Sequence, residues 1–272
     1  MLNYHKTWRF INSGPGSASH NMALDEAIAI SVRKNDSLPT LRVYTWDKPS
    51  VSIGCFQKIR DVNIKYCQNA GIPIVRRPTG GRAILHNEEL TYSFSVKTDN
   101  ELFSKGIFDS YKKISAALLL ALSKIGLSPE SKLIRGTRQP SPVTRRSKSP
   151  LCFQSISYGE ITIRNRKIIG SAQKRWIDGL LQQGSIPYSV EESMIQKVFR
   201  LQSSQDIKET IAGLKDMISG LSDKEFKEVI RISFEETFNI KFIPALPSQE
   251  EESLALKLEL DKYQASEWNL RQ

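Results

Sequence analysis

The sequence has few of the residues on which metal sites and disulfide frameworks depend. Its 272 residues include three cysteines and three histidines, and the cysteines are scattered without a C-x-x-C pair. Both a structural zinc site and a disulfide framework are therefore disfavoured. We expect neither a metal nor a cofactor.

Long apolar segments are also lacking. The longest apolar run, residues 116–122, is too short to cross a bilayer. Residues 1–6 lack the apolar core of a signal peptide. We therefore expect a cytoplasmic protein without a membrane partner.

Acidic residues are outnumbered, and the net charge is +10. Nucleic acid is the first partner to consider for a basic chain, but no helix-turn-helix, zinc finger or aromatic RNA-binding signature accompanies the charge. The basic residues concentrate only in a loop from Lys132 to Lys148, which has no acidic residue. This basic loop is either a solvated segment or a docking surface for an acidic protein. We expect no nucleic-acid partner.

Hydrophobic periodicity predicts an α+β fold. Alternating or β-rich stretches predict strands at 8–11, 41–46, 51–54, 72–75, 90–96, 158–163, 167–169 and 180–186, and residues 13–17 read as a turn. Helical spacing predicts helices at 21–32, 60–70, 108–125 and 250–263. Because no regular βαβ rhythm appears, we expect a mixed, largely antiparallel sheet with flanking helices.

The chain changes character after Pro187, from strands to helices and polar linkers. Ser222 and Glu225 form a capping box, and a four-residue stripe after it predicts a core-facing helix. The stripe consists of Phe226, Ile230, Phe234 and Phe238. We expect a core at residues 1–190 and a helical extension at 191–272 that completes the same domain.

Cys152 and Lys167 are a candidate nucleophile and its activating cation. Two β-rich runs around the polar turn at residues 164–166 predict a hairpin, which folds the segment before the first strand back toward Lys167. A thiol with a pKa of about 8.5 is only about 3% ionised at pH 7. An adjacent ammonium could bring that pKa to about 6.5 and ionise about three-quarters of the thiol. The alternative is a buried small cysteine and a surface lysine near a turn.

Residues 76–86 form a glycine loop, R-R-P-T-G-G-R-A-I-L-H. Adjacent glycines let the backbone approach a ligand closely, and arginines with exposed backbone N–H groups can hold a polar head group. It is not a phosphate-binding P-loop, because no Gly-Lys-Ser/Thr follows. An ordinary glycine turn is the alternative for the loop, and a structural hydrogen-bonding role is the alternative for His86.

These stretches together resemble the biotin/lipoate protein ligase superfamily. Residues 21–27 resemble its first helix, the glycine loop its acyl-binding loop, and residues 89–93 the following strand. Residues 166–173 resemble its lysine strand, 184–186 the next strand, and 267–269 its tail. The resemblance implies a class II synthetase-like sheet, with substrate contacts from the glycine loop and the lysine strand. The residues expected to contact substrate are Arg76, Arg77, Thr79, Gly80, Gly81, Arg82, His86, Gly170, Ser171 and Ala172.

The positions of Cys152, ahead of the hairpin, and Arg82, directly after the glycine pair, resemble those in the octanoyltransferase branch of the superfamily. Members of that branch need no ATP. That branch implies octanoyl transfer from acyl carrier protein through a Cys152 thioester to a lysine of a lipoyl domain, such as that of the glycine cleavage H protein. Lys167 would activate the thiol and later accept the proton of the substrate amine. Backbone N–H groups at residues 170–172 or 80–81 would hold the oxyanion. We expect a monomer, whose positive charge suits acidic protein partners.

Two positions depart from the family pattern. Asn87 stands where the ligases usually have aspartate, and Gln183 where relatives often have histidine. Val75, Tyr92 and Ile169 are candidates to line the acyl tunnel. An ATP-dependent lipoate ligase and a non-catalytic protein that binds acyl chains or lipoyl domains remain as alternatives.

Overall fold

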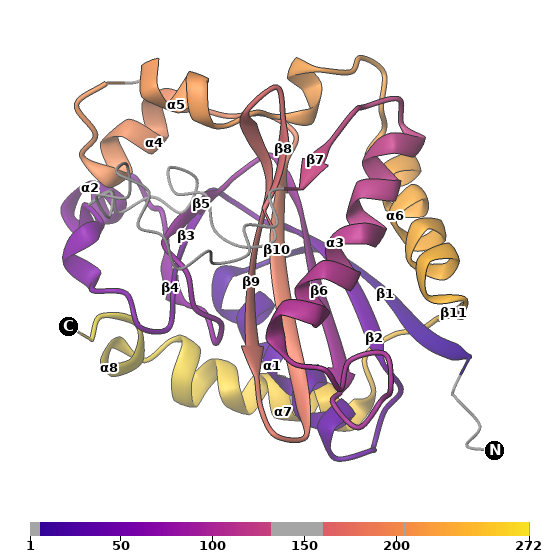
Figure 1. The fold of residues 1–272 in the computed structure, drawn as a ribbon. Helices are drawn as coiled ribbons and strands as arrows, with labels where there is room; N and C mark the ends of the chain where they lie inside the picture. Colours follow the sequence, from indigo (N-terminus) through magenta and orange to yellow (C-terminus); the bar gives the residue numbers. More distant parts are fainter. Residues whose placement is uncertain (1–5, 132–159, 204, 272) are drawn as a thin grey trace, which may run out of the picture.

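The described part of the chain folds into two sheets with helices around them. The computed structural model describes residues 6–131, 160–203 and 205–271, and within them it has sheets of eight and three strands (Figure 1). The large sheet has the order β11 (Lys241–Pro244), β1 (Thr7–Gly16), β2 (Thr40–Trp46), β6 (Glu89–Lys97), β10 (Gly179–Pro187), β9 (Arg166–Arg175), β8 (Ile161–Ile163) and β7 (Glu130–Ser131). The small sheet has the order β4 (Ile74–Arg76), β3 (Ser50–Ile53) and β5 (Ile84–His86).

Most neighbouring strands run antiparallel. The parallel pairs are β1 with β2, β1 with β11, and β3 with β4. This arrangement confirms the predicted α+β fold with a mixed, largely antiparallel sheet. The predicted turn at residues 13–17 is wrong, because β1 continues to Gly16. A register shift between Asn12 and Gly14 absorbs the extra residue, and Gly14 has the positive φ (+68°) that this irregularity needs.

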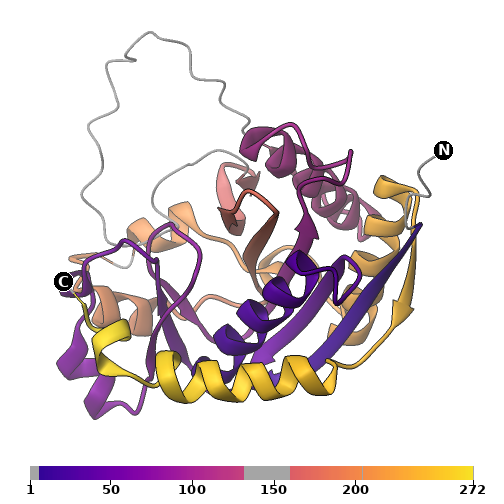
Figure 2. The same cartoon turned by 90° about the horizontal axis from the view of Figure 1, so that it is seen from below.

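Helices cover both faces of the large sheet. The helices are α1 (Ala18–Arg33), α2 (Ile64–Asn69), α3 (Ile107–Lys124), α4 (Glu192–Phe199), α5 (Gln205–Thr210), α6 (Asp223–Phe238), α7 (Gln249–Leu258) and α8 (Ser266–Asn269). Figure 2 shows α7 running alongside α1 on one side of the sheet, with α3 on the other. Among the described residues, none of these helices has the length and apolar composition needed to cross a membrane.

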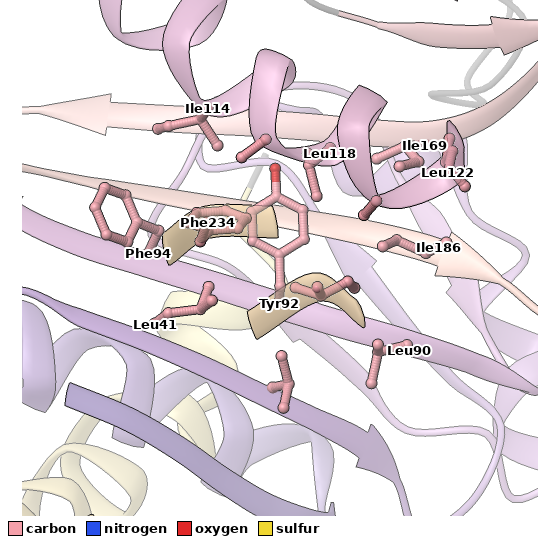
Figure 3. Close-up of a cluster of buried hydrophobic side chains, with 14 of the residues drawn as sticks. Leu41, Leu90, Tyr92, Phe94, Ile114, Leu118, Leu122, Ile169, Ile186 and Phe234 are labelled. Atoms are coloured by element: carbon pink, nitrogen blue, oxygen red, sulfur yellow. The ribbon is translucent and has the colours of Figure 1, made fainter. Parts of the chain in front are cut away.

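The main hydrophobic core lies between the large sheet and helices α3 and α6. Side chains of α3 point down onto those of β6 (Figure 3). The alternation of β6 sends Leu90, Tyr92 and Phe94 into this core. The intervening Ser93 donates to Asp25 of α1 on the opposite face. Strand β6 therefore separates a hydrophobic layer from a polar one.

The C-terminal third packs on both sides of this sheet. Ser222 caps α6 through the predicted capping box. The phenylalanine and isoleucine stripe of that helix is buried in the main core, as predicted. The segment predicted to be helical also contributes a strand, because β11 pairs with β1 at the edge of the large sheet. The domain boundary near residue 190 stays a prediction.

Strands β8 and β9 form the predicted hairpin. The turn residues Arg164 and Asn165 have φ values of +49° and +62°, as the tightest hairpin turns require. Across it, Thr162 pairs with Lys167. The hairpin therefore brings the start of β9 next to the residue that precedes β8, which is Glu160.

Candidate active site

A narrow cavity lies where the two sheets face each other, beside α1. Its walls come from strands of both sheets, from the glycine loop and from one helix. They consist of Met22, Tyr44, Trp46, Ser52, Arg77, Ile84, His86, Thr91, Gly170, Ser171, Ala172, Gln183, Gly184 and Ser185. The cavity volume of about 20 Å³ is room for about one water molecule. Five residues predicted to contact substrate thus line one cavity: Arg77, His86, Gly170, Ser171 and Ala172.

Arg77 holds the glycine loop in shape. Its guanidinium donates to the carbonyl oxygens of Gly80 at 2.7 Å and Arg82 at 2.7 Å. The loop also packs tightly on the end of β3, since a Cβ on Gly54 would lie 1.9 Å from the carbonyl oxygen of Gly81. Gly81 itself has a φ of +86°. This close approach therefore requires glycine at position 54, and the positive φ favours glycine at position 81.

Arg76 has a different environment. Its side chain is fully buried, and its guanidinium donates to carbonyl oxygens of two segments, the one that follows β3 and the C-terminal tail. These belong to Gly54, Cys55, Gln57, Trp268, Asn269 and Arg271. Burial lowers the pKa of Arg76, and the nearby charge of Arg271 lowers it further. The contacts place Arg76 at the junction of the C-terminal tail with β4, and it does not line the cavity.

Gln183 connects the glycine loop to α1. Its side-chain oxygen accepts from Thr79 Oγ1 at 2.8 Å, and its nitrogen donates to Asp25 Oδ2 at 2.7 Å. Asp25 is fully buried and also forms an ion pair with Arg42 at 2.7 Å. An amide suits this position, because one end faces a hydroxyl donor and the other an anionic acceptor. The other departure, Asn87, donates to Glu191 at 3.3 Å.

His86 lies within a chain of buried polar groups. Its Nε2 is 2.7 Å from Ser52 Oγ and its Nδ1 is 2.7 Å from Glu89 Oε1. The indole of Trp46 stacks on the imidazole, with ring centres 4.0 Å apart and planes 12° from parallel. The ring is therefore fixed by contacts at both nitrogens and on one face.

Lys167 is buried and forms an ion pair. Only 2% of its side chain is exposed, and its Nζ lies 2.5 Å from Oε1 of Glu160, whose side chain is 3% exposed. The backbone oxygen of Lys167 accepts from Ala212 N at 3.0 Å. Along β9, Lys167 precedes the cavity wall at Gly170 by three residues, or about 10 Å. Cys152 and the basic loop lie outside the described residues, so the pairing of Cys152 with Lys167 stays a prediction.

The three tunnel candidates do not line this cavity. Tyr92 and Ile169 belong to the main core, and Val75 belongs to the core beside α1. The hydroxyl of Tyr92 still reaches Ser171 Oγ at 2.8 Å, through the space that Gly184 leaves open. Burial raises the pKa of Tyr92 to about 12, so this hydroxyl stays neutral at physiological pH.

Sequence reasoning missed several residues of this region, among them Glu160, Ser52 and Glu89. Counting outward from the turn at 164–165 pairs Thr162 with Lys167 and places Glu160, two residues before Thr162, on the same face of the hairpin. That count was the signal available in the sequence for Glu160. Ser52 is a single polar residue within the strand predicted at 51–54, and Glu89 is one just before the strand predicted at 90–96. Only the pairing of β3 with β5 brings Ser52 and His86 together.

Comparison with known proteins identifies the class first. Residues 17–235 match the lipoyl protein ligase A/B catalytic domain. The chain belongs to this family.

Several full-length relatives narrow the comparison. An octanoyltransferase LipM of Carboxydothermus hydrogenoformans is 36% identical and covers 98% of this chain and 99% of its own. An octanoyltransferase LipM of Clostridioides difficile is also 36% identical, over 96% and 98% of the two chains.

Solved structures agree on the fold. A lipoate-protein ligase A bound with ATP has a TM-score of 0.82 at 26% identity, over 97% of this chain and 98% of the other. A putative lipoate protein ligase from T. acidophilum with bound lipoic acid has a TM-score of 0.79 at 26% identity, over 97% and 99%.

Proposed function

We propose that this protein is an octanoyltransferase of protein lipoylation and lipoate biosynthesis. It takes an octanoyl group from acyl carrier protein onto Cys152 and passes it to a lysine of a lipoyl domain, such as that of the glycine cleavage H protein. The observation that carries this proposal is the similarity of nearly the whole chain to octanoyltransferases at 36% identity. The ATP-bound ligase, at 26% identity, is more distant.

The reaction comprises two acyl exchanges. The Cys152 thiolate attacks the carrier thioester, a new C–S bond forms, and the carrier thiolate leaves. The lysine amine of the acceptor then attacks the Cys152 thioester, and the Cys152 thiolate leaves. Both steps begin from a thioester, so neither requires ATP.

Lys167 supplies the cation for the thiolate in this proposal. An ammonium at a buried position acts in a low-dielectric setting, where its attraction for an anion is stronger than in water. Glu160 holds that ammonium at 2.5 Å and fixes its position at the start of β9. As the carrier thiolate leaves in the first step it takes a proton from Lys167, so the neutral amine of Lys167 accepts the proton of the incoming amine in the second step and faces the departing Cys152 thiolate again as an ammonium.

The cavity provides the acyl site. In this proposal backbone N–H groups at Gly170–Ala172, on the cavity wall, hold the oxyanion, and Arg77 lines the same cavity while it holds the glycine loop. An octanoyl chain exceeds a volume of about 20 Å³, so the wall has to move when the substrate binds. Met22 is the most adaptable wall residue, because its side chain is unbranched and rotates about three bonds.

Protein partners are part of the same proposal. A net charge of +10 favours acidic domains by long-range attraction. A bipartite ligase from Thermoplasma acidophilum, similar at a TM-score of 0.79, was solved in a study with its E2 lipoyl domain. We propose a monomer in the cytoplasm, with substrate contacts from Thr79 and Arg82 of the glycine loop.

The decisive experiment omits ATP. The full chain is incubated with octanoyl-acyl carrier protein, and intact mass is followed before and after a lipoyl domain is added. We expect one octanoyl group on the enzyme, mapped to the Cys152 peptide, and then on the lipoyl domain, and no octanoyl transfer to the lipoyl domain by Cys152→Ala. Modification that requires free octanoate, ATP and magnesium would establish a ligase instead. Tight octanoyl binding without either product would establish a binding protein.

A further inference from the structure

A second nucleophilic arrangement exists in the cavity, apart from Cys152 and Lys167. Ser52 Oγ lies 2.7 Å from His86 Nε2, and His86 Nδ1 lies 2.7 Å from Glu89 Oε1. All three residues are at most 4% exposed. A hydroxyl, an imidazole and a carboxylate in this order are the components of an activated serine.

The neighbouring groups determine where the protons lie. Glu89 accepts from Ser185 Oγ at 2.6 Å and from Thr91 Oγ1, so its oxygens serve as acceptors. The hydrogen between Glu89 and the imidazole is therefore on Nδ1 of a neutral His86, leaving Nε2 as an acceptor. Arg77 Nη1 donates to Ser52 Oγ at 3.1 Å. The hydroxyl hydrogen of Ser52 is then directed at Nε2.

The surroundings suit attack by this hydroxyl. Ser52 and His86 sit on adjacent strands of the small sheet, β3 and β5, and Trp46 holds the imidazole plane by stacking. Ser52, His86 and Arg77 all line the cavity. The guanidinium of Arg77 next to Ser52 Oγ provides a positive charge where an oxyanion would develop.

We propose that Ser52 is a second nucleophile, with His86 as its general base and Glu89 orienting the imidazole, and that the cavity hydrolyses acyl thioesters. The Ser52 proton moves to His86 Nε2 while Oγ bonds to the acyl carbon, and the C–S bond breaks as the leaving thiolate takes that proton. Water then adds to the ester, His86 accepts its proton, and the carboxylic acid leaves as Oγ regains the proton. The net reaction converts a thioester and water into a carboxylic acid and a thiol, and Cys152 takes no part in it.

The test uses the full chain with Cys152→Ala, so that the proposed transfer route cannot contribute. Octanoyl-pantetheine hydrolysis is followed by thiol release, and an alkyl fluorophosphonate probe is mapped by peptide mass spectrometry. We expect thiol release above buffer, probe on the Ser52 peptide, and a loss of at least about 100-fold in both when Ser52→Ala is added.

Ser50→Ala is the matched control. Ser50 is also fully buried on β3, but its hydroxyl donates to the carbonyl of Lys48. This variant should keep the hydrolysis and labelling rates of Cys152→Ala. No thiol release above buffer together with no probe on Ser52 would overturn the proposal, as would unchanged rates in Ser52→Ala. The labelling arm depends on no Ser52 variant, so it decides the question even if that variant folds poorly.

Discussion

Replacing Glu160 by glutamine tests the ion pair on which Lys167 depends. The two side chains are 3% and 2% exposed and their charged atoms are 2.5 Å apart. Glu160→Gln leaves a buried ammonium without its carboxylate. Removing one partner of a buried pair typically costs about 3–5 kcal/mol. We expect a value near the lower end, about 3 kcal/mol, because the glutamine oxygen can still accept a hydrogen bond.

The assay is equilibrium unfolding in urea, followed by circular dichroism. The urea concentration at the midpoint should fall, while the slope of the unfolding free energy against urea concentration stays unchanged. This is the result expected when only stability changes. The expected loss corresponds to a melting temperature lower by about 6–12 °C for a chain of this size.

A double variant isolates the interaction. Lys167→Met alone leaves a buried carboxylate and should also be costly. Lys167→Met combined with Glu160→Leu replaces the pair by apolar side chains of similar volume, and should recover to within about 1 kcal/mol of the original protein. The stability loss of the double variant should therefore be smaller than the sum of the losses from the two single substitutions.

The chain offers a matched ion pair at the surface. Lys215 and Glu88 are 2.9 Å apart, but their side chains are 62% and 56% exposed. Glu88→Gln should cost at most about 1 kcal/mol, since solvent screens such pairs. If Glu160→Gln costs no more than Glu88→Gln, the reasoning from burial is refuted, and with it the role of Glu160 in holding Lys167.

Three further expectations concern other buried groups. Gly184→Ala should lower stability by about 1–3 kcal/mol in thermal unfolding, because its Cβ would lie 2.2 Å from the Tyr92 ring; an unchanged melting temperature would contradict this close packing. Burial raises the pKa of Tyr92 from 10.0 to about 12, so its stabilising effect is complete below pH 10 and is lost as pH rises toward 12. Between pH 9 and pH 11 the original protein should lose about 1.3 kcal/mol more than Tyr92→Phe, and equal losses would argue against the shift. Burial raises the pKa of Cys67 to about 11, so iodoacetamide at pH 8 should modify it only after denaturation, which peptide mass spectrometry can check.

Periodic segments were predictable from the sequence because burial on one side imposes a period. The alternation of residues 90–96 predicted its strand correctly, and the four-residue stripe of α6 predicted both its helix and its core-facing side chains correctly. The turn predicted at residues 13–17 failed because glycine and proline there occupy an irregular strand. In this case strand pairing with β2 outweighs local turn preference.

The candidate site was less accessible to sequence reasoning. The hairpin could be predicted, and it does turn Lys167 back toward the segment before β8, but the partner found there is Glu160. The partner of a single acidic residue such as Glu160 cannot be predicted until the register of the hairpin is known. The tunnel candidates lie in the hydrophobic cores and not on the wall of this cavity, since alternation identifies buried side chains without showing which space they face.

Neighbouring residues of one motif make different contacts, because successive side chains face opposite sides of the strand. On β6, Tyr92 enters the main core while Thr91 lines the cavity. At the end of β4, Arg76 binds carbonyl groups of the C-terminal tail while Arg77 shapes the glycine loop. Successive side chains of an extended chain point to opposite sides, which separates the contacts of these two adjacent arginines. The half of each motif that faces the cavity is therefore the half in which substitutions should alter acyl transfer more than stability.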